Sequence, residues 1–232
     1  TICEVSGSFD DALRIVLGRA EEMGAYVLNS VNPWRLEGQK TTAFEIWEQL
    51  DGDLGINVVV PVGNAGNISA IWKGFEELRD YGLTDEVPRM IGVQSSGAAP
   101  LARMFAKGAD SPEWVESPQT VASAIRIGRP INWKRAVRTV RSSGGSIYSV
   151  DDHEILEAMR LMATTEGIAA EPAGAAPIAL LKSGVESGHL PRDETYVCIA
   201  TGHHLKDPDP AHVSWNVPVP FEQYLERVTG RS

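Results

Sequence analysis

Residues 57–67 read NVVVPVGNAGN and decide the fold, because they join the most strand-like run of the chain to a glycine-rich turn. Residues 57–62 are apolar on both faces, as a central strand of a parallel sheet must be. Helical spacing of apolar residues begins directly after the turn and predicts a helix over about 68–81. A strand, a tight turn and a helix in this order indicate a parallel α/β fold.

The turn itself has the composition of an anion-binding loop. It consists of Gly63, Asn64, Ala65, Gly66 and Asn67, which we call the glycine loop. Two glycines allow a ligand to approach the backbone closely, and the N–H groups that begin the following helix converge on one anion. The loop is neither a Walker A motif nor a dinucleotide-binding fingerprint, because their spacings are absent. A plain strand-to-helix turn with asparagines in left-handed geometry is the alternative interpretation.

The same alternation of strands and helices continues on both sides of the glycine loop, so the sequence predicts a parallel twisted sheet with helices on both faces. Asp151 with Glu154 has the pattern of a capping box, and Ser8 with Asp11 has a similar one. Residues 107–133 form a long loop with short helices, and residues 32–34 form another loop. The predicted strands are 2–5, 25–28, 57–62, 90–94, 146–150 and 196–200, and the predicted helices begin near 8, 40, 68, 101, 133, 151 and 171.

Composition excludes several classes of function. The 232 residues include 21 Lys+Arg and 31 Asp+Glu, a net charge of −10, so a nucleic-acid-binding protein is not expected. Arg135, Arg138 and Arg141 have helical spacing and are expected to form one solvated face. No stretch has the length of a membrane span, and the opening residues do not resemble a signal peptide, so we expect a soluble cytoplasmic protein.

The metal-binding and redox residues give little signal. Cys3 and Cys198 are far apart in apolar surroundings and are expected to be buried and reduced. His203 and His204 are adjacent, and no third ligand follows at a recognisable spacing. The sequence therefore predicts no metal site and no disulfide.

Six segments, in order along the chain, resemble the threonine synthase family of pyridoxal-phosphate enzymes, which has the tryptophan-synthase-β-like fold. They are residues 29–41 (NSVNPWRLEGQKT), 60–70 (VPVGNAGNISA), 96–103 (SGAAPLAR), 122–137 (ASAIRIGRPINWKRAV), 166–176 (EGIAAEPAGAA) and 200–208 (ATGHHLKDP). Residues 122–137 discriminate this family from amino-acid dehydratases of the same fold, which share the phosphate loop.

The resemblance implies a role for several residues. The glycine loop would hold the phosphate of pyridoxal 5′-phosphate, and Thr201 would donate a hydrogen bond to an unprotonated pyridine nitrogen. Asn29, Ser30 and Arg35 would bind the phosphate of the substrate, O-phospho-L-homoserine, which reacts with water to give L-threonine and phosphate. Without the resemblance, Thr201 is explained as a turn cap, Arg35 as a surface ion-pair residue, and Glu171-Pro172 as a helix start.

The lysine that forms the Schiff base with the cofactor in this family has no match in the chain, so we expect it upstream of Thr1 and no catalytic residue within the chain. The sequence corresponds to the C-terminal two thirds of the family. Residues 1–30 are interpreted as a remnant of the smaller domain and 31–232 as the large cofactor domain. We expect this N-terminally truncated fragment to be inactive, and the full-length protein to be a homodimer.

Two alternatives remain open at this stage. A threonine or serine dehydratase would use the same phosphate loop but would need no second phosphate site. A non-catalytic homologue could keep the loop as a binding site for a phosphate-containing ligand without the lysine.

Overall fold

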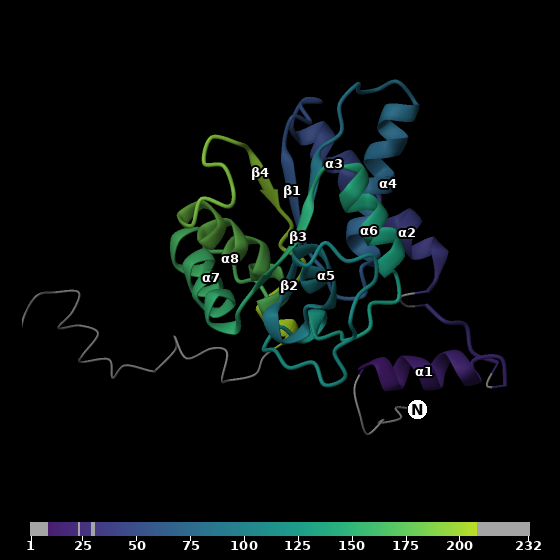
Figure 1. Ribbon diagram of the computed structural model, residues 1–232. Helices are drawn as coiled ribbons and strands as arrows, with labels where there is room; N and C mark the ends of the chain where they lie inside the picture. Colours follow the sequence, from purple (N-terminus) through teal and green to yellow (C-terminus); the bar gives the residue numbers. More distant parts are fainter. Residues whose placement is uncertain (1–8, 23, 29–30, 208–232) are drawn as a thin grey trace, which may run out of the picture.

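The computed structural model describes residues 9–22, 24–28 and 31–207 (Figure 1). Four parallel strands form one sheet in the order β3-β2-β1-β4. These are β1 (Asn57–Pro61), β2 (Arg89–Ser95), β3 (Ser146–Val150) and β4 (Tyr196–Cys198). Strand β1 lies between β2 and β4 and is buried along its whole length, which confirms the prediction of a central strand.

Helices cover both faces of this sheet, as predicted. The helices are α1 (Phe9–Arg19), α2 (Pro33–Gln39), α3 (Thr41–Gln49), α4 (Gly66–Asp80), α5 (Pro100–Ala106), α6 (Trp133–Ser142), α7 (Asp152–Thr165) and α8 (Pro172–Glu186). Short 3₁₀ helices are η1 (Ser96–Ala98), η2 (Ser123–Ile125) and η3 (His204–Lys206). Figure 1 shows α7 and α8 on one side of the sheet and α3, α4 and α6 on the other.

The alternating side chains of β1 supply two hydrophobic cores. Val58 and Val60 pack into one core together with Phe75 of α4. Val59 points to the opposite face and packs into the second core, which includes Met159 of α7. Because both faces are covered, the strand is apolar at every position, and this explains its unbroken run of valines.

Most of the predicted elements are confirmed within a few residues. Helix α6 begins at the predicted residue, and strand β3 has the predicted bounds. The capping box before α7 is present, since the Glu154 backbone N–H donates to Asp151 Oδ1 at 2.8 Å and the Asp151 N–H donates to Glu154 Oε2 at 2.7 Å. Helix α4 begins at Gly66, two residues earlier than predicted, so the glycine loop overlaps its first turn.

Two predictions near the N-terminal end of the described chain are wrong. Residues 25–28 form no strand, and the side chains of Tyr26 and Leu28 are about 70% exposed. The carbonyl of Val27 accepts instead from the Asn32 side chain at 3.1 Å. Residues 32–34 are not a loop but the start of α2, with Asn32 as its N-cap and Pro33 in its first turn.

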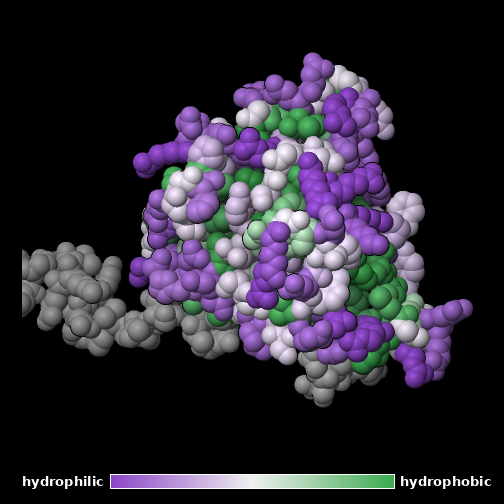
Figure 2. All heavy atoms as spheres, viewed as in Figure 1, coloured by the Kyte–Doolittle hydropathy of each residue, from purple (hydrophilic) through white to green (hydrophobic). Residues whose placement is uncertain are grey.

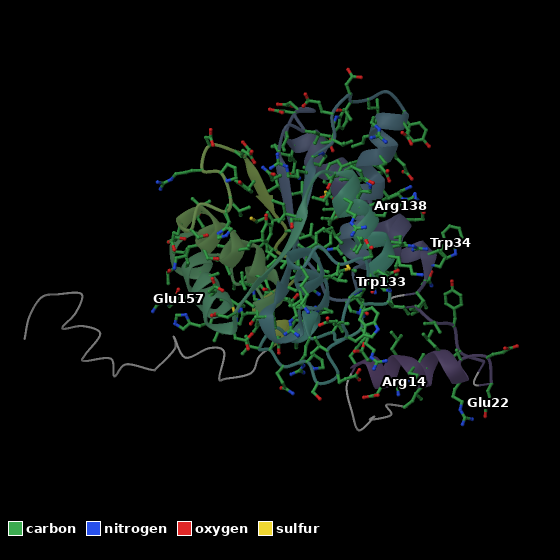
Figure 3. The ribbon with its side chains drawn as sticks, viewed as in Figure 1. Arg14, Glu22, Trp34, Trp133, Arg138 and Glu157 are labelled. Carbon is green, nitrogen blue, oxygen red and sulfur yellow. The ribbon has the colours of Figure 1, made fainter. Side chains whose placement is uncertain are left out.

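Other predictions concern the surface and the ends. Arg135, Arg138 and Arg141 are exposed, as predicted, and Figure 3 shows Arg138 on the outer side of α6. Figure 2 shows apolar surface among polar side chains near α1, none of whose residues is buried. No helix within the described ranges is long and apolar enough to cross a membrane. The predicted strand at 2–5, the Ser8 cap and Cys3 lie outside the described residues.

Candidate functional site

A cavity of about 470 Å³ lies where the chain leaves the carboxyl ends of β1 and β4. The carboxyl ends of neighbouring parallel strands lie at the same edge of a sheet, where ligands of α/β proteins bind. The glycine loop follows β1, and Thr201 follows β4. Both line the cavity, as do residues of α2, η2 and η3. The fold therefore brings together segments that are more than 130 residues apart in sequence.

The glycine loop presents the start of helix α4 to this cavity. Ala65 precedes the helix in the left-handed conformation, with φ 65° and ψ 11°, and turns the chain from strand to helix. Unlike α2 and α7, helix α4 has no side-chain cap, and unlike α7 it has no acidic residue in its first turn. The first N–H groups of this 15-residue helix and the positive end of its dipole thus face the cavity. No side chain at the cap position accepts a hydrogen bond from these N–H groups.

The two glycines of the loop have different structural roles. A Cβ on Gly63 would lie 2.9 Å from the carbonyl oxygen of Ala124 in η2, so protein packing requires glycine there. A Cβ on Gly66 would meet nothing closer than the Asn132 side chain at 3.5 Å. Protein packing would therefore tolerate a methyl group at Gly66, and the space that the methyl would fill belongs to the cavity.

The segment after η2 supports the loop from the outside. The backbone N–H of Asn132 donates to the Asn64 carbonyl at 3.1 Å, and the N–H of Ile131 is 3.4 Å from Asn64 Oδ1. These contacts hold the loop through the long connection between α5 and α6. Residues 122–137, which were expected to discriminate this sequence from dehydratases, are thus in direct contact with the glycine loop.

A buried carboxylate also lines the cavity. Glu171 is only 2% exposed, and its Oε1 accepts from the Thr201 hydroxyl at 3.0 Å. Its Oε2 is 3.0 Å from the ammonium group of Lys206, which is largely exposed. Thr201, Glu171 and Lys206 all line the cavity. Thr201 is therefore more than a turn cap, since its hydroxyl is held by a side chain 30 positions earlier in the chain.

Arg35 lies on the cavity wall formed by α2. In the part of the chain that the structure describes, its guanidinium group has neither a carboxylate partner nor a side-chain hydrogen bond, in contrast to the ion-paired Lys206. The ion-pair alternative considered for Arg35 therefore has no support among these residues. Asn29 and Ser30, the other predicted phosphate ligands, lie outside the described residues.

Sequence reasoning missed several polar residues on the cavity wall, namely Asn32, Gln39, Asn132, Glu171 and Lys206. All five lie inside the segments that carried the resemblance, but only their proximity in space marks them as part of one site. Glu171 had been explained completely by helix initiation. The signal that could have found it is its type, because a glutamate before an alanine-rich helix is rarely buried unless it has partners.

The residues present fit a phosphate-bearing aromatic cofactor. The uncapped N-terminus of α4 and the methyl-sized space beside Gly66 suit a phosphate group, and the Thr201 hydroxyl offers a contact for a ring nitrogen. No group of three or more histidine, cysteine or acidic side chains in the described ranges is arranged to hold a metal ion. The donor set thus favours an organic phosphate.

Comparison with known proteins also indicates an aromatic cofactor with a phosphate group. A family model described as "Pyridoxal-phosphate dependent enzyme" matches residues 1–202. Threonine synthase of Methanocaldococcus jannaschii is 51% identical over 221 residues, which cover 95% of this chain and 55% of that protein. Threonine synthase of Methanosarcina acetivorans is 50% identical, over 89% of this chain and 51% of that protein. The chain thus spans about half the length of these relatives.

Solved structures share the fold. Threonine synthase from Escherichia coli superposes with a TM-score of 0.72 at 24% identity, covering 94% of this chain and 51% of that one. Maize serine racemase superposes with a TM-score of 0.69 at 20% identity, covering 99% of this chain and 63% of that one. Because the family model matches residues 1–202 and a relative is 51% identical over 95% of the chain, this chain belongs to the pyridoxal-phosphate-dependent enzyme family.

Proposed function

We propose that the protein is a threonine synthase, which converts O-phospho-L-homoserine and water to L-threonine and phosphate. The observation that carries the proposal is a cavity lined by two groups that can each bind a phosphate. One is the uncapped start of α4, and the other is the guanidinium group of Arg35, which has no ion pair within residues 9–22, 24–28 and 31–207. The relatives at 50% identity and above support the same activity, since both are named threonine synthase.

In this proposal the glycine loop holds the cofactor phosphate. The backbone N–H groups at the start of α4 would donate to the phosphate oxygens, and the helix dipole would stabilise their charge. Thr201 would contact the ring nitrogen. When bound, pyridoxal phosphate stabilises the negative charge that develops on the carbon atoms of an amino-acid substrate. The chain's contribution is to orient the ring between these two contacts.

Arg35 would bind the phosphate group of the substrate, together with Asn29 and Ser30. A guanidinium group can donate two parallel hydrogen bonds to phosphate oxygens, and this would fix the leaving group in one orientation. Arg35 is also the residue that favours threonine synthase over a dehydratase, because threonine and serine have no phosphate for it to bind. The fold alone does not separate these activities, since a threonine deaminase also superposes, with a TM-score of 0.64.

The lysine that attaches the cofactor is proposed to lie outside these 232 residues. Within the described residues, Lys206 lines the cavity but is ion-paired with Glu171. The other lysines are Lys40, Lys73, Lys107 and Lys182, each ion-paired with a glutamate, and Lys134, which lies over the Trp133 ring. We therefore propose that this chain binds cofactor and substrate phosphate, and that turnover needs a lysine from a longer polypeptide.

Further parts of the proposal concern organisation. Residues 1–30 would belong to the smaller domain and its crossover, and residues 31–232 to the large cofactor domain. The full-length enzyme would be a cytoplasmic homodimer that acts on a small-molecule substrate. Sedimentation of the full-length enzyme at micromolar concentration would test the dimer.

Turnover assays with two substrates test the function. Phosphate release from O-phosphohomoserine and ammonia release from L-threonine are measured for the full-length protein and for the 232-residue chain. We expect phosphate release by the full-length protein and none by the chain alone. Ammonia release from threonine without phosphate release would instead indicate a dehydratase, and neither activity would indicate a binding protein. Phosphate release by the chain alone would refute the proposed position of the lysine.

A further inference from the structure

Helix α2, which carries Arg35, is held to the rest of the molecule by little hydrophobic packing. It lines the cavity of the candidate site, and it also borders a second cavity of about 350 Å³ that residues of α4 and α6 line. None of its residues is buried, and Trp34 is 70% exposed at the edge of the molecule (Figure 3). Hydrophobic burial therefore contributes little to the position of this helix, and polar contacts have to fix it.

Four charged side chains connect the end of α2 to the middle of α4, and we call them the α2–α4 ion-pair network. The ammonium group of Lys40 lies 2.7 Å from Glu37 Oε2 and 2.7 Å from Glu77 Oε2. The ammonium group of Lys73 contacts Glu37 and lies 3.6 Å from Glu77 Oε1. Each lysine thus contacts both glutamates, and the positive and negative charges balance.

This network constrains its members more than a single surface ion pair would. The side chains of Lys40 and Glu77 are only 19% and 24% exposed, so water screens their attraction less than it screens fully exposed charges. Hydrogen bonds from Lys40 and Lys73 lower the pKa of Glu37 to about 2, so this carboxylate is ionised at neutral pH. An isolated exposed pair contributes little, whereas members of a network share partners and restrict one another.

The backbone fixes the end of α2 on the same part of α4. A Cβ on Gly74 would lie 2.4 Å from the Lys40 carbonyl oxygen and 2.7 Å from the Ala43 Cβ atom. Glycine is unfavourable inside a helix, so this close approach explains its presence in α4. The junction of α2 and α3 therefore lies directly on α4. Within the network, Glu37 is the member nearest in sequence to Arg35, two positions away.

We propose that Glu37 and Lys73 are positioning residues that hold α2 on α4, so that Arg35 meets the substrate phosphate at a fixed place relative to the start of α4. The inference rests on the proposed function, in which Arg35 binds the substrate phosphate and the start of α4 binds the cofactor phosphate. Helix α4 is then the common support of both binding groups. Its first turn holds one phosphate, and about two turns further on it holds the helix that binds the other.

The contacts of Leu36 show how closely the two groups are coupled. Its Cδ2 atom lies 3.8 Å from the position that a Cβ on Gly66 would occupy, so α2 reaches the start of α4 as well as its middle. A shift of α2 along or away from α4 would therefore change the distance between the two binding groups. Without the ion pair of Glu37 and Lys73, a smaller fraction of molecules would hold Arg35 in the competent place, and affinity for the substrate would fall by that fraction.

Binding of inorganic phosphate measures the position of Arg35 without turnover. The full-length enzyme is freed of cofactor and saturated with pyridoxamine 5′-phosphate, and the Kd of inorganic phosphate is measured by calorimetry. Glu37→Gln and Lys73→Met should each raise this Kd, and the KM for O-phosphohomoserine, about 3- to 10-fold. Both should leave the affinity for pyridoxamine 5′-phosphate unchanged. Lys73→Arg keeps the charge that faces Glu37, so its Kd and KM should stay close to those of the unsubstituted enzyme.

Glu157→Gln is the matched control for loss of an ion pair. Glu157 lies 3.1 Å from Lys182, on the opposite side of the molecule from Trp34 (Figure 3). A hydrogen bond from Lys182 lowers the pKa of Glu157 as well, so the substitution removes a comparable interaction. It should leave the Kd of inorganic phosphate unchanged. A rise as large as that of Glu37→Gln would show that lost stability weakens binding, and would overturn the inference.

A double-mutant cycle tests whether the network acts through Arg35. In an Arg35→Gln background, Glu37→Gln should raise the Kd of inorganic phosphate no further, because the position of α2 matters through the guanidinium group that it carries. An equal rise in both backgrounds refutes the inference. If Glu37→Gln does not fold, Lys73→Met decides the same question. An Arg35→Gln variant with unchanged phosphate affinity would refute the proposed substrate site itself, whereas a rise from Arg35→Gln but not from Glu37→Gln or Lys73→Met would refute only the positioning role.

Discussion

The two glycines of the glycine loop should respond to the same substitution in opposite ways. A methyl group added by Gly63→Ala would lie 2.9 Å from the Ala124 carbonyl oxygen and 3.2 Å from the Ile125 Cα atom. Overpacking of this kind costs about 1–3 kcal/mol, so the melting temperature should fall by roughly 2–10 °C. The methyl of Gly66→Ala meets only ordinary contacts, and alanine also reduces the entropy of the unfolded chain, so stability should be unchanged or slightly higher.

The affinity for the ligand should be affected by Gly66→Ala, the substitution that leaves stability unchanged. If a phosphate occupies the space beside Gly66, the methyl of Gly66→Ala displaces it from one of the N–H donors at the start of α4. Hydrogen bonds to charged groups contribute about 1.5–3 kcal/mol, so affinity should fall by roughly 10- to 150-fold. The dissociation constant of pyridoxamine 5′-phosphate is measured by tryptophan fluorescence, and stability by thermal unfolding without ligand.

Gly18→Ala is the matched control, because Gly18 also lies in a helix with open space around it and does not line the cavity. It should leave the affinity unchanged and should change the melting temperature by no more than about 2 °C. Unchanged affinity in Gly66→Ala would refute the assignment of the loop to the cofactor phosphate. A fall in melting temperature as large as that of Gly63→Ala would show that packing, and not a ligand, requires glycine at position 66.

Four further predictions concern other parts of the chain. Arg35→Gln in the full-length enzyme should raise the KM for O-phosphohomoserine about 10- to 100-fold and leave the affinity for pyridoxamine 5′-phosphate unchanged. A weaker affinity for pyridoxamine 5′-phosphate with an unchanged KM would contradict a substrate role for Arg35. Asp151→Ala removes the cap of α7 and should lower the free energy of unfolding by about 1 kcal/mol, measured with urea. Burial raises the pKa of the Cys198 thiol to about 12, so in a Cys3→Ser background iodoacetamide should label the unfolded but not the folded chain at pH 8. Hydrogen bonds from Lys40 and Lys73 lower the pKa of Glu37 from 4.5 to about 2. The ionised carboxylate therefore stabilises the folded chain above pH 4.5, and this stabilisation is lost as the pH falls toward 2. Glu37→Gln should flatten the pH dependence of the melting temperature between these two pH values.

The sheet and its helices could be predicted because their signals are local. The apolar run that became β1 needs both of its faces covered, and this requirement alone places helices on each side of the sheet. The capping box at Asp151 likewise determines the start of α7 from residues three positions apart. Local signals failed where tertiary context decides. Residues 25–28 have apolar residues typical of a strand, but they gained no strand as a neighbour, and the Val27 carbonyl bonds to Asn32.

The candidate site was predictable only in part for the same reason. The glycine loop is contiguous, so its chemistry is visible in one stretch of sequence. The contact between Thr201 and Glu171 joins residues 30 positions apart, and the ion pair with Lys206 joins residues 35 positions apart. No spacing rule connects them, because the turn after β4 and the start of α8 meet only when the sheet has formed.

Glu171 shows why a sufficient local explanation does not exclude a second role. Proline at the first position explains why α8 begins at Pro172, and Glu171 is then its N-cap. A glutamate that served only as a cap would be expected to accept from an N–H group in the first turn of its own helix. The side chain of Glu171 makes no such bond, and its two oxygens turn to Thr201 and Lys206 instead. Helix initiation therefore accounts for the proline, whereas the buried glutamate is accounted for by the hydroxyl and the cation that it holds at the cavity.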